Sequence, residues 1–418
     1  MFNTIIGHLR QSQQIVLAVA SSGIASLLLL GGRTAHSKFK IPLNILPEST
    51  CNIEKNSNLG EFIRQTSVIV WDEAPMCHRH ALEALDRTLK DIRDDERNFG
   101  GVIIVFGGDF RQTLPVVNRG SRARIIDACI KKSSLWDSVQ ILSLRHNMRL
   151  DQESQNRSEF LLQVGDGKAV EYPDIGRHFI RLPDELCETQ SLDHLIDEIY
   201  GEITSSDLSD RAILTPKNVD VTYINNTISH KYDRRQTHTF KSADSVELDD
   251  PSDHVWPVEF LNSLEPNGIP PHELVLAIGM PIVLLRNLSP SQGLCNGTRL
   301  CIEELNMLVI KAKILNGTHV GEVAAIPRVN LELTQSNLPF TLCRRQFPVR
   351  VAFAMTINKS QGQTINHVGL YLPSPVFSHG QLYVALSRCP KFENLHILID
   401  HDPDSNHTAN IVYDEVLD

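Results

Sequence analysis

Apolar residues in this chain gather in short runs that end in polar residues, and these runs predict buried strands. Gln14–Ala20, Val68–Trp71 and Gly100–Asp109 each contain a continuous stretch rich in aliphatic and β-branched side chains. Such runs are typical of strands that are buried on both faces of a parallel sheet. Val139–Leu144 predicts a further strand. The first third of the chain is therefore expected to form a parallel sheet.

Helical periodicity separates these strands. Asn3–Arg10 has apolar residues at helical spacing, Ile24–Leu30 reads as a short helix that stops at two glycines, and Arg79–Arg93 carries four aliphatic residues on one side. Alternating strands and helices with polar strand ends are the pattern of a doubly wound α/β fold. A second series of this kind starts at Ala212–Asn218. It continues near the C-terminus with strands at Val368–Tyr371 and Asn394–Ile399 around a helix at Gln381–Arg388.

A different pattern lies between the two halves of this second series. Closely spaced short strands with Asn-Gly turns are predicted at Met280–Leu285, Thr298–Leu305, Met307–Leu315, Gly321–Ile326 and Gln346–Phe353. Such spacing indicates a small β-barrel or sandwich-like insert. An acidic, proline-rich stretch over residues 233–271 comes before most of it and indicates a surface excursion or linker.

Two adjacent carboxylates follow one of the buried strands. Burying Asp72 and Glu73 inside a sheet would be costly, so we expect them at the carboxyl end of their strand, where open α/β folds bind ligands. There, Asp72 would hold Mg²⁺ and Glu73 would polarise an attacking water, as nucleotide hydrolysis requires. Gln112 follows the next strand, where its amide could reach both a γ-phosphate and a water. The alternative for the carboxylates is an ordinary solvated acidic turn.

Composition narrows the class of protein without deciding its function. At 418 residues the chain is long enough for two or three domains, and no apolar run reaches the length that a bilayer requires. Eight scattered cysteines without a CxxC pair favour reduced thiols inside a cell. A formal net charge of −10 does not indicate nucleic-acid binding. It does not exclude it either, because a local basic groove could bind nucleic acid.

Two local stretches invite a functional interpretation. The basic, hydroxyl-rich stretch Arg33–Lys40 contains one aromatic residue, Phe39, a combination that suits single-stranded nucleic acid; a solvated loop is the alternative. Cys77–His80 suggests a metal site. The start of a helix is the better interpretation, because no second ligand pair lies at zinc spacing.

Nine motifs in order resemble the Pif (petite integration frequency) helicases of superfamily 1, and most closely the helicase region of Helitron transposons. They span nearly the whole chain. The motifs are Ala20–Ala25, Gly32–Ser37, Trp71–Met76, Gly107–Gln112, Asn147–Arg149, Leu214–Asn218, Asn296–Arg299, Asn358–Thr364 and Tyr383–Arg388.

The resemblance implies an ATP-driven 5′-to-3′ DNA helicase with two RecA-like domains and a small SH3-like insert in the second. The implied boundaries are 1–150 for the first domain, 151–285 with 350–418 for the second, and 286–349 for the insert. The implied cofactors are ATP and Mg²⁺. The implied partners are single-stranded DNA and DNA fork or duplex junctions, with no membrane, and a monomer is expected.

The resemblance also assigns roles to individual residues. Asp72 binds Mg²⁺, Glu73 is the catalytic base, Gln112 reads the γ-phosphate and Arg388 is the arginine finger. Arg149 and Gly362 join the nucleotide site. The segments that line the single-strand channel contribute Ser22, Gly23, His36, Phe39, Lys359, Ser360, Gln361 and Thr364. A different interpretation of Arg388 is a solvated cation at a helix end, interacting with its own helix dipole.

The family's phosphate loop, GxxGxGK[ST], does not precede the first helix. Met1–Thr4 stands where the residues just after that loop are expected. We therefore expect an N-terminally truncated first domain that lacks the strand leading into the loop. This predicts little ATP hydrolysis. It also predicts a gap or an unpaired edge between the strand at Ile103–Phe106 and the strand at Val139–Leu144.

Two functional hypotheses follow. The first is an ATP-dependent DNA helicase, and the second is a catalytically inactive remnant that binds only single-stranded DNA or a partner. Helicases of this family act in DNA repair, DNA recombination, telomere maintenance and rolling-circle transposition, and a helicase core looks alike in all of these. The nucleus is the expected compartment, with the mitochondrion as the alternative.

Overall fold

A computed structural model of the chain describes residues 1–144, 155–201, 208–231, 237–247, 256–266, 268–333, 340–401 and 406–417. The chain divides into two compact units. Unit 1 contains Met1–Leu195 and Thr356–Asp418, and unit 2 contains Ile196–Met355. This division follows compactness, so the three domain boundaries expected from the sequence stay a prediction.

The N-terminal part of unit 1 is built on a four-stranded parallel sheet. Its strands are β2 (Arg33–Thr34), β1 (Val16–Ala20), β3 (Val68–Asp72) and β4 (Ile103–Phe106), in that order. Ala20 lies opposite Asp72, and Trp71 lies opposite Phe106. The strand ends thus meet at one edge of the sheet. The expectation of parallel strands is confirmed here.

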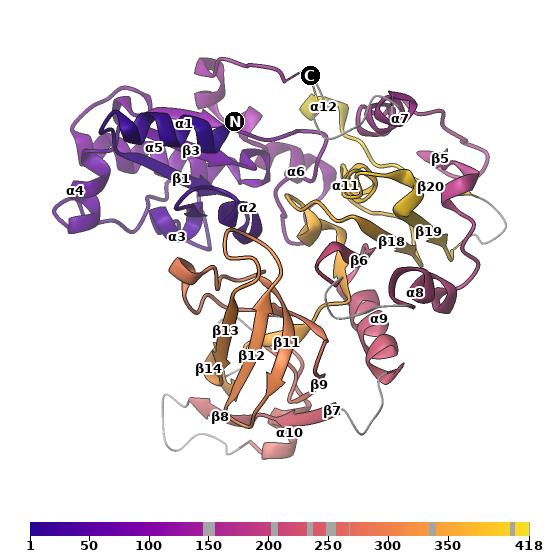
Figure 1. Cartoon of the computed structure of the whole chain (residues 1–418). Helices are drawn as coiled ribbons and strands as arrows, with labels where there is room; N and C mark the ends of the chain where they lie inside the picture. The colour runs from indigo at the N-terminus through magenta and orange to yellow at the C-terminus, as the bar shows by residue number, and fades with distance from the viewer. Residues whose placement is uncertain are drawn as a thin grey trace. The chain divides into compact units, whose positions relative to one another are not determined.

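Two helices bury the alternate faces of this sheet. On one face, Ile6 of α1 (Phe2–Gln11) packs with Val16, Ala18 and Val70. On the other face, Leu85 and the neighbouring aliphatic residues of α5 (Arg79–Arg93) join the cluster that contains Leu17, Val19 and Trp71. Alternate residues of a strand point to opposite faces, so each strand serves both clusters. Both helices lie beside the sheet in Figure 1, and the expected range of α5 is confirmed at both ends.

β4 is the last strand of this sheet in the described part of the chain, and this corrects two expectations. Ile103 is 64% exposed, so β4 is not buried on both faces as its sequence suggested. Val139–Leu144 forms no strand, and Ile141, Leu142 and Leu144 are exposed. A strand needs a partner for its backbone groups, and apolar composition alone does not provide one. Because Val139–Leu144 is not a strand, the predicted gap or unpaired edge between it and the strand at Ile103–Phe106 stays a prediction.

The other elements of unit 1 are mostly short. The helices are α2 (Gly23–Leu27), α3 (Ala35–Phe39), α4 (Asn58–Arg64), α6 (Arg122–Ala128), α7 (Gln155–Gly165), α11 (Gln381–Ser387) and α12 (Asp414–Leu417), while α8 (Leu192–Tyr200) runs into unit 2. β18 (His367–Leu372) and β19 (Leu395–Ile399) pair in parallel, and β5 (Phe179–Arg181) pairs antiparallel with β20 (His407–Ala409). In the described ranges, no helix combines the length and apolar character needed to cross a bilayer.

Unit 2 is rich in antiparallel strands. One sheet has the order β13 (Val323–Pro327), β12 (Val309–Ile314), β11 (Arg299–Leu305), β10 (Pro281–Leu284) and β16 (Val349–Val351). A second has the order β14 (Val329–Leu333), β15 (Thr341–Gln346) and β8 (Ala243–Glu247), and β7 (Thr237–Lys241) pairs with β9 (Glu273–Ala277). The remaining elements are β6 (Arg211–Thr215), α9 (Asn218–Lys231), α10 (Val258–Ser263) and β17 (Ala354–Thr356). The predicted insert is thus β-rich, but β7, β8, β14 and β15 were not expected.

A buried ion pair holds the second of these sheets. The side chains of Arg344 and Asp244 are both fully buried, and Arg344 Nη2 lies 2.6 Å from Asp244 Oδ2. The same guanidinium donates to the carbonyl oxygens of Leu261, Leu264 and Pro270. A buried pair of this kind is stable only when its remaining donors are also satisfied. Here it ties β8 and β15 to the segment around α10.

Candidate active site

Asp72 and Glu73 lie where the sequence placed them, at the carboxyl end of β3. Asp72 is the last residue of the strand, and its Oδ1 accepts a hydrogen bond from the Glu73 amide at 2.9 Å. Glu73 adopts a left-handed conformation, with φ 52° and ψ 38°, before the short 3₁₀ helix Ala74–Met76. Non-glycine residues rarely occupy this region, and strained backbone of this kind is concentrated at functional sites.

The Glu73 carboxylate is not part of a solvated turn. Glu73 is only 9% exposed, and Gln361 Nε2 donates to its Oε2 at 3.5 Å. Burial, together with the neighbouring Asp72 carboxylate, raises the pKa of Glu73 to about 7, although the positive charge of Arg388 and the Gln361 hydrogen bond oppose this rise. A carboxyl group that exchanges its proton near neutral pH is suited to act as a general base.

Arg388 directly follows α11 and faces the same region. Its Nε and Nη1 donate to the carbonyl oxygens of Val384 and Gln363, each at 3.1 Å. Only 4% of the residue is exposed, so the interpretation of Arg388 as a solvated helix-end cation is wrong. Its charge lies near enough to Glu73 to lower the pKa of that carboxyl group. A cation and a potential base therefore converge within unit 1.

The segment after β4 forms a further wall of this site. Asp109 Oδ2 accepts a hydrogen bond from the Tyr383 hydroxyl of α11 at 3.0 Å. Thr113 is buried, and its Oγ1 donates to Gln361 Oε1. Gln112 Oε1 is buried without a hydrogen-bond partner among the described residues. Because an unsatisfied buried acceptor is costly, this oxygen marks a place where a bound group could supply a donor.

Two residues that the sequence did not single out hold this wall in place. His379 Nε2 donates to the Phe110 carbonyl oxygen at 2.7 Å, and its Nδ1 accepts from the Tyr413 amide at 2.8 Å. The two bonds require a neutral ring, and burial lowers the pKa of His379 accordingly. Gly380 has φ 69°, and a Cβ there would lie 2.2 Å from the Arg111 carbonyl oxygen. The glycine immediately before a predicted helix was the signal that could have revealed this contact.

The residues predicted to contact DNA fall into an exposed group and a buried group. Lys359, Thr364 and His36 are exposed, and Gly23 is half-buried. Ser22 is also half-buried, and its hydroxyl caps α2 by accepting from the Ala25 amide at 3.1 Å. These side chains remain candidates for a nucleic-acid surface.

Phe39, Ser360 and Gln361 do not present their side chains to solvent. Phe39 is fully buried, with its ring centroid 6.2 Å from that of Trp71, so its predicted role in stacking on a base is wrong. The Ser360 hydroxyl donates to the Ile357 carbonyl oxygen. Gln361 faces Glu73 and Thr113 instead of solvent. Phe39 is buried because burying its ring against apolar residues of unit 1 is favourable, although its neighbours in the sequence are polar.

The remaining predicted residues are Gly362 and Arg149. Gly362 has φ 80°, and a Cβ there would lie 3.7 Å from Glu73 Oε1, so its backbone borders the site. Arg149 lies outside the described residues. Burial raises the pKa of the Cys77 thiol to about 12, and His78 caps α5, so the Cys77–His80 stretch leads into a helix as expected.

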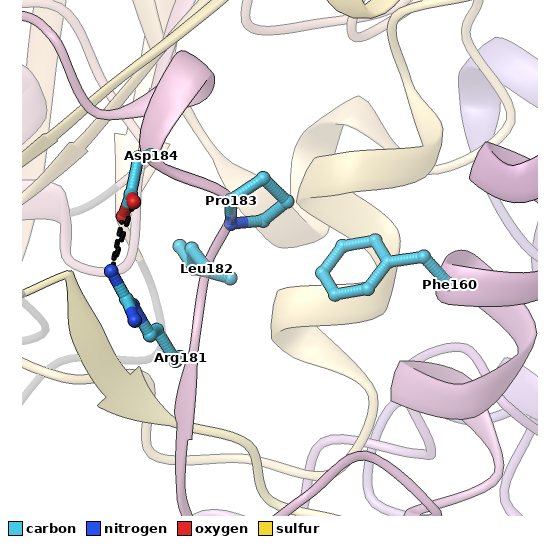
Figure 2. A pocket seen from close by; sticks show the side chains of 5 residues that line it. All are labelled: Phe160, Arg181, Leu182, Pro183 and Asp184. Carbon is cyan, nitrogen blue, oxygen red and sulfur yellow. Dashed lines mark hydrogen bonds and ion pairs between the residues drawn. The ribbon is translucent and has the colours of Figure 1, made fainter.

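A separate hollow of about 270 Å³ lies elsewhere in unit 1, and Figure 2 shows its lining. The Phe160 ring points from α7 toward Leu182 and Pro183, and Arg181 pairs with Asp184 on the other side. This hollow contains none of the predicted site residues. Its two charged groups neutralise each other, so it offers no unpaired charge to a ligand.

Comparison with known proteins matches both units of the chain. A family model described as PIF1-like helicase matches residues 1–174, and another, described as the 2B domain of DNA helicase Pif1, matches residues 259–305. The chain is similar to PIF1-like helicases over both matched regions. It is 27% identical over 421 residues to the ATP-dependent DNA helicase PIF1 of Homo sapiens, covering 96% of this chain and 56% of that protein. The Pif1 helicase of Bdellovibrio bacteriovorus is 26% identical over 385 residues, covering 91% of this chain and 77% of that protein.

Solved Pif1 structures share the fold of this chain. The Pif1 helicase from Bacteroides in complex with ADP-AlF3 and single-stranded DNA matches with a TM-score of 0.69 and 21% identity, covering 98% of this chain and 93% of that one. The Candida albicans Pif1 helicase matches with a TM-score of 0.65 and 22% identity, covering 99% and 90% of the two chains. The expected α/β class with two RecA-like domains is confirmed. The chain spans about half the length of the vertebrate relatives that it matches.

Proposed function

We propose that this protein is an ATP-dependent DNA helicase that moves 5′-to-3′ along single-stranded DNA and separates duplex at forks or junctions. The observation that carries the proposal is the meeting of Glu73, Gln361 and Arg388 in unit 1, beside the unsatisfied acceptor of Gln112. A base with a pKa near neutrality and a buried cation are two of the groups that phosphoryl transfer to water uses. The match of residues 1–174 to the PIF1-like helicase model supports the same reaction.

Each residue has a distinct part in the proposed hydrolysis. Glu73 accepts the proton of the attacking water. Burial suits it to this part, because it raises the pKa of the carboxyl group to about 7. Arg388 offers its guanidinium to the negative charge that develops on the transferred phosphoryl group. Its bonds to Val384 and Gln363 fix its direction before the reaction starts.

Mg²⁺ fits this site as an ion that takes few of its ligands from the protein. Among the described residues, no group of three or more His, Cys, Asp or Glu side chains has the arrangement of a metal site. Asp72 would therefore be its protein ligand, with water and phosphate oxygens completing the octahedron that Mg²⁺ prefers. When bound, the ion would neutralise charge on the phosphates of ATP.

The exposed residues His36, Lys359 and Thr364 and the half-buried Ser22 and Gly23 supply the proposed contacts to DNA. They combine one cation with small polar groups and backbone amides, which suits the phosphates of a single strand. One structural neighbour is a Bacteroides Pif1 bound to single-stranded DNA, which supports this substrate. Another is described as two Pif1 helicases coordinating at a forked duplex, so the proposed monomer is a separate question.

A second candidate is DNA binding without hydrolysis. The Phe2 ring packs against Gly107, where an added Cβ would lie 2.2 Å from the ring and 3.1 Å from Asp72 Oδ1. An apolar ring this close to the proposed Mg²⁺ ligand favours the second candidate.

Two measurements test the proposal. Binding of a labelled oligonucleotide at several salt concentrations should weaken in Lys359→Ala, with a salt slope about 0.7 shallower for the one lost phosphate contact. Lys391→Ala is the control, because Lys391 is also exposed and pairs with Glu393. If Lys391→Ala weakens binding as much, the proposed groove is wrong.

The second measurement is steady-state ATP hydrolysis with single-stranded DNA. A helicase requires stimulated turnover that Glu73→Gln lowers by about 10²- to 10⁴-fold, the usual contribution of a general base. The exposed Glu96 provides the control variant Glu96→Gln. DNA binding without any stimulated turnover supports the second candidate, and absence of both activities refutes the two candidates together.

A further inference from the structure

Gln361 joins two parts of the candidate active site although its sequence position suggested a DNA contact. Its Oε1 accepts from Thr113 Oγ1, and its Nε2 donates to Glu73 Oε2 at 3.5 Å. Gln361 is 2% exposed and Thr113 is 1% exposed. Each end of the amide is matched to its partner, since only the oxygen can accept and only the nitrogen can donate to a carboxylate. The orientation of this side chain is therefore fixed.

The same short segment reaches solvent on both sides of Gln361. Lys359 lies in the 3₁₀ helix Ile357–Ser360 and is exposed, as is Thr364. Between them the backbone bends at Gly362, where an added Cβ would lie 3.4 Å from the Ala25 Cβ and 3.7 Å from Glu73 Oε1. Because packed interiors transmit strain, a shift at Lys359 or Thr364 is passed on to the residues between them.

We propose that Gln361 is a positioning residue that couples occupancy of the single-strand groove to the orientation of Glu73. The path is the hydrogen-bonded chain Thr113–Gln361–Glu73, and the inference rests on the proposed function. A strand held by Lys359 and Thr364 displaces or orders their segment, and the Gln361 amide carries that change to the Glu73 carboxylate. Thr113 adjoins Gln112, so the same displacement reaches the residue proposed to read the γ-phosphate.

Such coupling allows an enzyme to delay ATP hydrolysis until single-stranded DNA is bound. Sites are coupled when a shared element has different arrangements with and without the ligand. The shared element here is one buried amide, and its two partners stand on segments far from it in sequence. Removing its hydrogen bonds should separate DNA binding from the response at Glu73 while leaving both surfaces intact.

The test is hydrogen exchange of the full chain with and without an oligothymidylate, read at residues 72–77 and 107–114. These amides include Ala74, which donates to the Gly107 carbonyl oxygen, and Glu73. We expect DNA to slow their exchange in the wild type by about fivefold or more, the lower range of typical coupling between sites. Gln361→Met and Thr113→Val should lose this response at oligothymidylate concentrations that saturate each variant. Thr113→Ser, which keeps the hydroxyl group, should retain the response.

Thr88→Val is the matched control. Thr88 is also buried in unit 1, and its hydroxyl bonds with the Ala84 carbonyl oxygen and the Cys51 amide, away from Gln361. This variant loses a buried hydroxyl in the same way and should keep the full exchange response. A response that Thr113→Val loses and Thr88→Val retains is not a general effect of destabilisation.

Three outcomes would overturn the inference. If the wild type binds DNA and exchange at residues 72–77 stays unchanged, no signal reaches Glu73. If Gln361→Met and Thr113→Val keep the response, the signal takes another route. In both cases the proposed helicase function stands. If the wild type binds no DNA at all, the proposed function fails and the coupling fails with it.

Discussion

Glu73 combines a left-handed backbone with a buried carboxyl group, and both features cost stability. Its φ of 52° is unfavourable for a residue with a Cβ, and its burial disfavours the charged form. A glycine would relieve the backbone and a glutamine would avoid the charge. Keeping glutamate at this position is understandable only if the carboxylate itself is needed.

The burial of Glu73 predicts a pH-dependent stability. The pKa rises from 4.5 to about 7 on folding, so the folded state holds the proton more tightly than the unfolded state. The free energy of unfolding should therefore fall as pH increases from about 4.5 to about 7. Glu73→Gln lacks this titration, so its stability relative to the wild type should increase by about 3 kcal/mol over that range. Urea denaturation at pH 5 and pH 8 measures this, with Glu96→Gln as the control. A difference independent of pH would contradict the prediction.

Phe39 illustrates how a ring in a basic stretch can belong to the core. It packs against Trp71 and is fully buried. Phe39→Ala should lower the free energy of unfolding by about 3–5 kcal/mol through the cavity that it leaves. Phe39→Leu keeps most of the packing and removes the ring, so its affinity for single-stranded DNA should equal that of the wild type. A loss of about 1–3 kcal/mol in DNA binding by Phe39→Leu would show that the ring stacks on a base after all.

Helix α11 depends on one glycine for its approach to the segment after β4. Gly380 combines a left-handed φ with the close passage of the Arg111 carbonyl oxygen, so a methyl group there meets both backbone strain and a clash. The position of this helix in turn determines where Tyr383 and Arg388 lie. The residue before α11 therefore helps to shape the site, although it takes no part in the reaction.

Two glycine-to-alanine variants should shift stability in opposite directions. Gly380→Ala should lower the free energy of unfolding by more than about 1 kcal/mol, because both its φ and its space are unsuitable. Gly7→Ala lies inside α1 with no atom near the added Cβ, and should raise it by about 0.5–1 kcal/mol. Thermal or urea unfolding of both variants tests this. Equal effects would mean that the clash at Gly380 is absorbed.

Strands were predicted well where pattern and partner agree. β1, β3 and β19 follow continuous apolar runs, and each has a neighbouring strand. Val139–Leu144 has the run without a neighbour among the described residues, and it is exposed. β5 and β20 pair across more than half the chain, and nothing local in either segment reveals the other. A strand is completed by its partner, so periodicity alone finds only some of them.

The protein as a whole consists of two compact units, and the buried clusters around Trp71 and around Leu331 lie in different units, which predicts separable stabilities. Asp244→Ala leaves the Arg344 charge buried without its partner, and breaking such a pair costs about 3–5 kcal/mol. Hydrogen exchange should therefore speed up in unit 2 and stay unchanged in β1 and β3 of unit 1. Lys241→Ala breaks an exposed pair with Glu273 in unit 2 and should cost at most about 1 kcal/mol. Faster exchange in β1 and β3 of Asp244→Ala would contradict independent units.

The linear order of residues was enough to place Asp72, Glu73 and Gln112 at strand ends, because strand periodicity and the cost of burying carboxylates act locally. It could not show that Arg388 and Gln361 turn inward or that Phe39 enters the core. It also could not show that the pKa of Glu73 approaches neutrality. Each of these depends on which distant segment covers a side chain, and burial is a property of the assembled fold. The candidate catalytic groups could therefore be predicted from the sequence around them, whereas their burial and their pKa values depend on residues that only the fold brings close.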